Sequence, residues 1–310
     1  MRALSAWLGG AAILVALALT LDGYAADLFR KLLLVATLCV GFNFLFGIAG
    51  QLAISHIAFY GIGAYGVVVL AFQFGWPLPL AIIGSIMICG VIALLVAIPS
   101  TRLEGFFLAL ATLAFAQLFS VVILQGGDVT GGPQGLSGYA APDYFGLPSD
   151  GGGYTLVIVA VFLMTLAILV RLDHSWFGRA CRAIRDNPAT AAAMGVDVFR
   201  TKVAAFTLTS TLAGVTGMAY AFTDNYLSPL VFGLEPMFML LFMTVIGGTG
   251  RHAGAVIGAA LLFLAPEVLE EWVGRHYMLG FGVLVVAAIL FQPAGLMGLW
   301  DGARRRWGMR

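Results

Sequence analysis

Apolar runs long enough to cross a lipid bilayer follow one another along almost the whole chain. Of the 310 residues, 61% are hydrophobic and only 10% are charged, whereas a soluble domain carries about 25% charged residues. Because a spanning helix needs ~20 mostly apolar residues, the sequence predicts an all-α fold, a polytopic membrane helix bundle of about ten transmembrane segments in a single domain, 1–310. The predicted segments are 3–21, 28–46, 51–72, 78–98, 105–124, 154–171, 200–222, 234–248, 253–269 and 277–292.

The eighth predicted segment, 234–248, is too short to cross a bilayer alone. It ends in the sequence IGGTG, and such an ending favours a tilted or broken helix that is buried within protein. The junctions 47–51 and 247–254 are also rich in glycine. We therefore expect irregular backbone at both junctions.

The first apolar run has two interpretations. Its basic start, apolar core and small residues near Ala25 and Ala26 resemble a cleavable signal peptide. The next apolar run begins almost at once, which favours an uncleaved first membrane segment.

The basic residues are distributed unevenly between the loops. Lysine and arginine collect on the cytoplasmic side of membrane proteins. With ten segments and the N-terminus inside, 13 of the 16 lysines and arginines lie on the cytoplasmic side, which predicts that both termini are cytoplasmic. The net charge of +1 gives no indication of a nucleic-acid partner. The loops predicted to lie outside are acidic, with Asp128, Asp143, Asp150, Asp224 and Glu235.

The stretch 178–202 differs from the uncharged runs on either side of it. It holds five basic and two acidic residues, and it faces the cytoplasm in the predicted topology. Arg179, Arg182 and Arg185 recur every three residues, which places them along one face of a helix.

A second, short helix is predicted within this stretch. Asn187 followed by Pro188 is typical of an N-cap and a first helical position, and Gly195 is typical of a left-handed helix stop. A basic interfacial helix held by anionic headgroups would explain the arginines. Docking to a partner protein explains the neutral, alanine-rich helix better, because small residues let a partner approach closely, and we favour this interpretation.

The chain lacks the groups with which transporters couple to an energy source. An ATP-binding P-loop needs a lysine directly after a glycine, and neither Lys31 nor Lys202 has one. Proton-coupled carriers usually hold acidic residues at mid-membrane, whereas all fifteen Asp and Glu residues map to loops or segment ends. The histidines and cysteines share no metal-ligand or catalytic spacing. We expect a non-catalytic chain without a cofactor that takes its energy from a separate ATPase; an ion-coupled secondary carrier and a passive channel are alternatives.

Uncharged polar side chains are scattered through the predicted interior. A structural role is favoured for the serines and threonines, while structural and pathway roles are equally open for His56 and Gln117. Gly214 and Gly217 belong to a small-residue face that suits close helix packing. The candidate residues of a translocation path are Asn43, Gln51, His56, Gln117, Thr207 and Thr211.

Five motifs, taken in order, resemble a known family. They are GQLAISHIAFYGIGAY (50–65), TGGPQGLSG (130–138), GRACRAIRDNPATAAAMG (178–195), IGGTGRHAGAVIGA (246–259) and FQPAGLMG (291–298). Each motif alone has low specificity. In their order and spacing, the motifs resemble those of the LivM-type permeases of bacterial ABC importers for branched-chain amino acids, over nearly the whole chain. The resemblance implies a fold similar to type II importers and a location in the bacterial inner membrane.

The resemblance also implies a function and a set of partners. The chain would form the translocation path for branched-chain or similar hydrophobic amino acids, with urea, short amides or aromatic acids as alternatives. The partners would be a second permease subunit that forms a heterodimer with this chain, two ATPase subunits that bind ATP and Mg, and a periplasmic solute-binding protein.

Two loops carry the roles that the resemblance implies. The cytoplasmic loop at about 172–199 would couple to the ATPase, although the Glu-Ala-Ala start common in the family is replaced here by Ala189-Thr190-Ala191. The long periplasmic loop at about 125–153 and the other outer acidic residues would meet the binding protein. The implied coupling residues are Arg179, Arg182, Arg185, Asn187, Pro188, Ala191 and Gly195; the implied docking residues are Asp128, Asp143, Asp150, Asp224 and Glu235.

Overall fold

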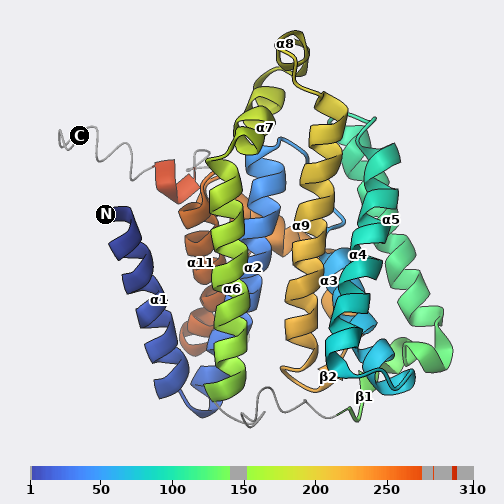
Figure 1. The fold of residues 1–310 in the computed structure, drawn as a ribbon. Helices are drawn as coiled ribbons and strands as arrows, with labels where there is room; N and C mark the ends of the chain where they lie inside the picture. The colour runs from blue at the N-terminus through green and yellow to red at the C-terminus, as the bar shows by residue number, and fades with distance from the viewer. Residues whose placement is uncertain (1, 140–151, 274–281, 283–294, 299–310) are drawn as a thin grey trace.

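The computed structural model describes residues 2–139, 152–273, 282 and 295–298. Helices run side by side between two ends of a bundle (Figure 1), and a two-stranded sheet lies at one of these ends. The α-helices are α1 (Arg2–Thr20), α2 (Gly23–Asn43), α3 (His56–Val68), α4 (Leu78–Ser100), α5 (Phe106–Gln125), α6 (Gly152–Asp173), α7 (Trp176–Asp186), α8 (Pro188–Ala193), α9 (Val198–Ala221), α10 (Leu234–Gly247) and α11 (His252–Val273). The other elements are the π-helices η1 (Phe44–Ile48) and η2 (Val69–Gln73), the 3-10 helices η3 (Gly127–Val129), η4 (Gly132–Gln134) and η5 (Pro229–Phe232), and the strands β1 (Leu136–Ser137) and β2 (Tyr226–Leu227).

The described helices agree with the predicted membrane segments. Seven of them, counted with their π-helical ends, are long and apolar enough to cross a membrane. The first nine predicted segments each overlap one helix of the bundle, and the tenth, 277–292, lies outside the described residues. The short eighth segment is confirmed, because α10 has 14 residues and so spans only roughly 21 Å at 1.5 Å per residue.

Three helices form the centre of the bundle. The most apolar stretches of α2, α3 and α9 are 78%, 67% and 61% buried, whereas those of α4, α5 and α11 are 28% buried. The outer helices therefore present leucine, isoleucine and valine side chains outward, as expected where the surroundings are lipid or another membrane chain. α1 lies at the edge of the bundle against α6 (Figure 1).

Glycines let α3 and α9 touch backbone to backbone. A Cβ atom placed on Gly63 would lie 1.9 Å from the carbonyl oxygen of Gly214, and one on Gly217 would lie 1.8 Å from that of Tyr60. The predicted small-residue packing face is thus confirmed, and α3 is its partner. In lipid the hydrophobic effect does not drive helices together, so close packing of this kind stabilises the association of α3 with α9.

The two glycine-rich junctions are irregular, as expected, and they meet in space. Residues 49–55 separate η1 from α3, and residues 248–251 separate α10 from α11. A Cβ atom on Gly47 would lie 2.3 Å from the backbone nitrogen of Gly250. Segments about 200 residues apart in the sequence are therefore in backbone contact.

The bundle has two distinct ends (Figure 1). α7 and α8 project from one, which we call the α8 end. At the other, the sheet end, β1 pairs with β2 in antiparallel register, with Leu136 opposite Leu227. The Tyr139 hydroxyl donates to the Ala221 carbonyl at 2.7 Å, so the described start of the long loop is tied to the end of α9.

The glycine contact between α3 and α9 is testable by adding one methyl group. Gly63→Ala should lower the free energy of unfolding by about 1–3 kcal/mol, because the new Cβ atom would overlap backbone that cannot rotate away. The midpoint temperature of unfolding is measured by heating the detergent-solubilised protein and recording the fraction that remains monodisperse. Gly90→Ala is the control, since its nearest non-local atom would be 3.6 Å away. Equal midpoints for the two variants would contradict this account of the contact.

Candidate coupling element and interior cavity

A break between α7 and α8 is built into the sequence. The residue before a proline disfavours the helical conformation, and Asn187 before Pro188 has φ −160° and ψ 106°. The Asn187 Oδ1 atom accepts a hydrogen bond from the Thr190 backbone nitrogen at 2.9 Å. The predicted N-cap and first helical position are confirmed.

The end of α8 is fixed equally firmly. The Gly195 nitrogen donates to the Ala192 carbonyl at 3.0 Å, and the Val196 nitrogen donates to the Ala191 carbonyl at 3.1 Å. Gly195 has φ 85°, which a residue with a Cβ atom rarely adopts. These are the two bonds of a Schellman motif, so the predicted left-handed stop is confirmed.

α8 presents a small apolar tip beyond the bundle. Met194, at its C-terminal end, is 81% exposed, whereas Ala191 is 3% exposed and faces its own chain. Sequence analysis named Ala191 and missed Met194. The sequence did carry a signal for this tip, because a methionine, whose side chain adapts to different partners, stands directly before the glycine that ends the helix in a polar loop.

The three arginines of α7 do not form one free basic face. Arg179 is exposed, but Arg182 forms an ion pair with the buried Asp173, and an Arg185 Nη1–H donates to the Gly47 carbonyl. Two of the three predicted coupling arginines therefore hold α7 to the bundle.

Arg185 reaches the place where the two glycine-rich junctions meet. Gly50 has φ 70°, and a Cβ atom there would lie 2.9 Å from the Arg185 Cγ atom. A Cβ atom on Gly250 would lie 3.2 Å from Arg185 Nη1, and the Gly250 nitrogen donates to Asn43 Oδ1 at 2.8 Å. One side chain of α7 thus contacts the ends of both α2 and α10.

Five of the six predicted path residues lie inside this chain. Asn43, Gln51 and His56 are at most 1% exposed, and Gln51 Nε2 donates to a backbone carbonyl of α9 at 3.1 Å. The Thr211 hydroxyl donates to the Thr207 carbonyl at 2.7 Å. Thr207 and Thr211 are only partly buried. Buried side-chain atoms of Asn43, Gln51, His56 and Thr207 lack a hydrogen-bond partner within the described part of the chain.

Gln117, the sixth predicted path residue, is placed differently. It was expected in the interior, but its side chain lies on the exposed surface of α5. There it borders a small cavity of about 30 Å³ with Ser120 and Gly233. An all-round apolar helix such as α5 gives no periodic signal for its buried face, which is why the sequence did not reveal this orientation.

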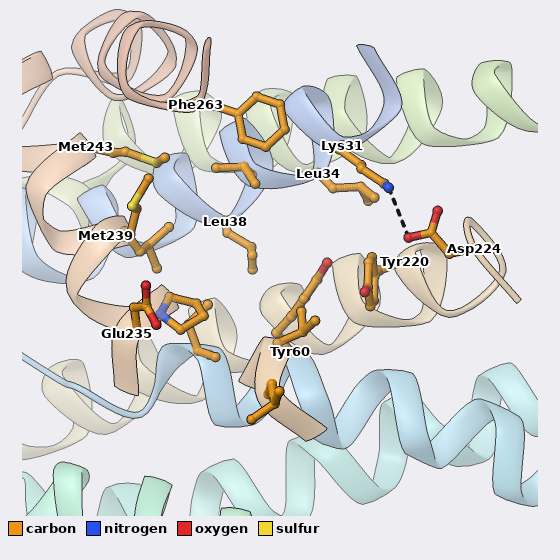
Figure 2. A pocket seen from close by; sticks show the side chains of 16 residues that line it. Lys31, Leu34, Leu38, Tyr60, Tyr220, Asp224, Glu235, Met239, Met243 and Phe263 are labelled. Carbon is orange, nitrogen blue, oxygen red and sulfur yellow. Dashed lines mark ion pairs between the residues drawn. The ribbon is translucent and has the colours of Figure 1, made fainter. Parts of the chain in front are cut away.

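Two of the predicted docking acids line a larger cavity of about 590 Å³ (Figure 2). Asp224 pairs with Lys31 across 3.1 Å, and Glu235 lies at the first turn of α10. Tyr60 contributes its hydroxyl from α3. Sequence analysis missed Lys31 and Tyr60, because they come together only when α2 and α3 pack against the loop after α9.

The remaining predicted docking acids lie in the long loop. Asp128 is exposed, and its carbonyl accepts a hydrogen bond from Gln73 Nε2 at 3.0 Å. Asp143 and Asp150 lie outside the described residues.

Reactive and metal-ligating groups are sparse in the described residues. Cys39, Cys89 and Cys181 are buried free thiols. Burial raises the pKa of Cys181 to about 12, so this thiol stays protonated at neutral pH. Among the residues that the structure describes, no three His, Cys, Asp or Glu side chains are grouped to hold a metal ion.

The Arg185 contact predicts a local loss of protection. Arg185→Met should speed amide hydrogen exchange in 44–52 and 246–252 by about ten- to a hundredfold, because a hydrogen bond to a charged group contributes about 1.5–3 kcal/mol. Hydrogen exchange with mass spectrometry on the purified protein measures this rate. Arg179→Met, on the same helix, is the control and should leave both segments unchanged. Equal exchange in the two variants would show that Arg185 does not hold the junctions.

Comparisons with known proteins agree with this architecture. A family model described as "Branched-chain amino acid transport system / permease component" matches residues 24–291. The chain is 29% identical over 299 residues to the high-affinity branched-chain amino acid transport system permease protein LivM of Escherichia coli K12, which covers 87% of this chain and 69% of that protein. The LivM protein of Salmonella typhimurium is 29% identical over 301 residues, 88% of this chain and 70% of that protein.

LivH proteins match as well. The high-affinity branched-chain amino acid transport system permease protein LivH of Escherichia coli K12 is 24% identical over 283 residues, 85% of this chain and 91% of that protein. Matches to both LivM and LivH indicate a pair of permease chains in such a transport system. No solved structure matches the chain. The family match covers most of the sequence, from α2 through α11 and including the α7–α8 element, and the chain therefore belongs to the family of branched-chain amino acid transport permease components.

Proposed function

We propose that this chain is one permease subunit of an ATP-driven importer for branched-chain or similar hydrophobic amino acids. Its relatives carry the names of high-affinity branched-chain amino acid transport permeases. The observation that carries the proposal is α8, a short helix with a fixed start, a fixed stop and an exposed apolar tip at one end of a membrane bundle.

The α8 end faces the cytoplasm in this proposal. The basic residues of α7 and of the start of α9 lie there, and positive charge favours the cytoplasmic side. Both termini would be cytoplasmic and the membrane would be a bacterial inner membrane. The sheet end would then face the periplasm, where a solute-binding protein docks against Asp128, Asp143 and Asp150.

The partners follow from what the chain itself lacks. Two ATPase subunits that bind ATP and Mg would seat α8, and a second permease subunit would complete the path. A push or pull on α8 would reach α7 through the break at Asn187, the single residue between the two helices. Arg185 would then pass the displacement to the contact between Gly47 and Gly250, where both α2 and α10 end.

The docking role of α8 is tested in the assembled transporter. Gly195→Val should cost ~1–2 kcal/mol in the left-handed stop and lower substrate-stimulated ATP hydrolysis several-fold. Met194→Asp should do the same, because a carboxylate would have to enter an apolar contact. Both rates are measured in proteoliposomes that contain the binding protein, the permeases and the ATPase.

Ala160→Val is the control for these variants. It introduces the same β-branched side chain at an exposed position with ordinary helical backbone on α6, outside the α7–α8 element. Substrate-stimulated ATP hydrolysis should stay within about twofold of the parent rate, because surface substitutions usually change free energies by no more than about 0.5 kcal/mol. Full stimulation in both Gly195→Val and Met194→Asp would remove α8 from the coupling contact.

Two polar residues test the path. Gln117→Leu and His56→Leu should each lower uptake up to about tenfold, since a lost hydrogen bond to a passing solute is worth ~0.5–1.5 kcal/mol. Assembly should be unaffected, because neither side chain makes a hydrogen bond to another described residue. Thr216→Val is the control, because that hydroxyl bonds only its own helix at Leu212. Uptake and size-exclusion profiles are measured together; normal uptake in both leucine variants would exclude them from the path.

A further inference from the structure

The cavity at Lys31 has an ion pair at one end and mostly apolar side chains toward the other, where Glu235 also lies (Figure 2). Its volume of about 590 Å³ lies within the ~300–1,000 Å³ range of small-molecule sites. Its walls come from α2, α3, the end of α9, the segment before α10, α10 itself and α11. It therefore sits where the central helices meet the short helix α10.

The charged end holds an ion pair whose ammonium group has further N–H donors available. Lys31 Nζ lies 3.1 Å from Asp224 Oδ2, and the two side chains are 41% and 38% exposed. An ammonium group has three donors, so Lys31 can bind a second carboxylate. Asp224 can likewise accept from a second ammonium group. A pair of this kind is complementary to a molecule that carries both charges.

Two further polar groups face the same space without a partner. Tyr60 is 5% exposed, and its hydroxyl points into the cavity in Figure 2. It makes no hydrogen bond within the described residues, and Glu235 makes no ion pair or hydrogen bond there. A hydroxyl that faces the cavity without a bond to the protein is free to bond a ligand.

The apolar end is lined by flexible and aromatic side chains. Met239 and Met243 come from α10, Phe263 from α11, and Leu34 and Leu38 from α2. Methionine side chains adapt to ligands of differing shape. This end suits a branched aliphatic group, and the Glu235 carboxylate, one turn before Met239 on α10, lies beside it in Figure 2.

We propose that this cavity is a binding site for a zwitterionic α-amino acid with an aliphatic side chain. The ligand's carboxylate would pair with Lys31, its ammonium group with Asp224, and its side chain would lie among the methionines. The proposal deepens the proposed function, on which it rests, because it places a substrate site within a single permease subunit at the sheet end.

A lipid chain is the competing occupant. Lys31, Asp224 and Glu235 give the cavity one positive and two negative side chains, which disfavours the anionic headgroups of a bacterial membrane. The charged end would also remain unused by an acyl chain. The amino acid is therefore the occupant that uses both ends.

The test is protection of a cysteine at the cavity. Leu230 lines the cavity and is 83% exposed, so Leu230→Cys is introduced with Cys39, Cys89 and Cys181 replaced by alanine. Its rate of reaction with a membrane-impermeant maleimide is measured in the assembled transporter in nanodiscs without ATP. Leucine at millimolar concentration should slow this rate several-fold. Val129→Cys, exposed outside the cavity, should react at an unchanged rate.

Ligand analogues and a charge variant sharpen the test. Isopentylamine lacks the carboxylate and 4-methylpentanoate lacks the ammonium group, so neither should protect. Lys31→Met should abolish protection by leucine, and Lys31→Arg should keep part of it. Asp27→Asn removes a charge of α2 outside the cavity lining and should leave protection intact.

Uptake by the same preparation separates the two hypotheses. Absence of protection in a complex that takes up leucine with ATP would overturn the cavity site and leave the proposed function standing. Absence of ATP-driven uptake of any branched-chain amino acid would count against the proposed function itself. A maleimide reaction rate that falls as the phospholipid content rises, and that leucine does not change, would identify the cavity as a lipid site and overturn the proposal.

Discussion

The backbone contact between α3 and α9 is the constraint on which the rest of the bundle depends. In lipid, apolar side chains gain little by leaving their surroundings, so helices associate through close packing. Gly63 and Gly217 allow this approach because neither carries a Cβ atom that would overlap the facing carbonyl. With α3 and α9 fixed, α2 and α4 pack on either side of them, and the outer helices keep their apolar faces for lipid or partner chains.

A second contact connects this core to the α8 end. The end of α2 and the end of α10 meet through Gly47 and Gly250, and Arg185 of α7 lies against both. Helix ends leave unpaired carbonyls, and the arginine supplies a donor to one of them. A polar loop element is thereby joined to two central helices at their least regular points, where a small displacement meets the least backbone resistance.

The cavity at Lys31 has the same origin as these junctions. α10 is too short to fill the height of the bundle, and the segment 222–233 that precedes it leaves space beside α2 and α3. Polar groups reach that space from within α2 and α3, from the loop after α9 and from the first turn of α10. Residues that a sequence places far apart, such as Lys31 and Asp224, become neighbours for this reason.

The sequence by itself determined the features that depend on neighbouring residues. Run length and charge predicted the first nine membrane segments, and local chemistry predicted the cap at Asn187, the stop at Gly195 and the packing role of Gly217. Only the tertiary structure decided that Arg182 and Arg185 turn toward their own chain, that Gln117 faces outward, and that Asp224 pairs with Lys31. Helices that are apolar on every side carry no signal for the face that is buried, so these orientations are set by contacts between segments distant in the sequence.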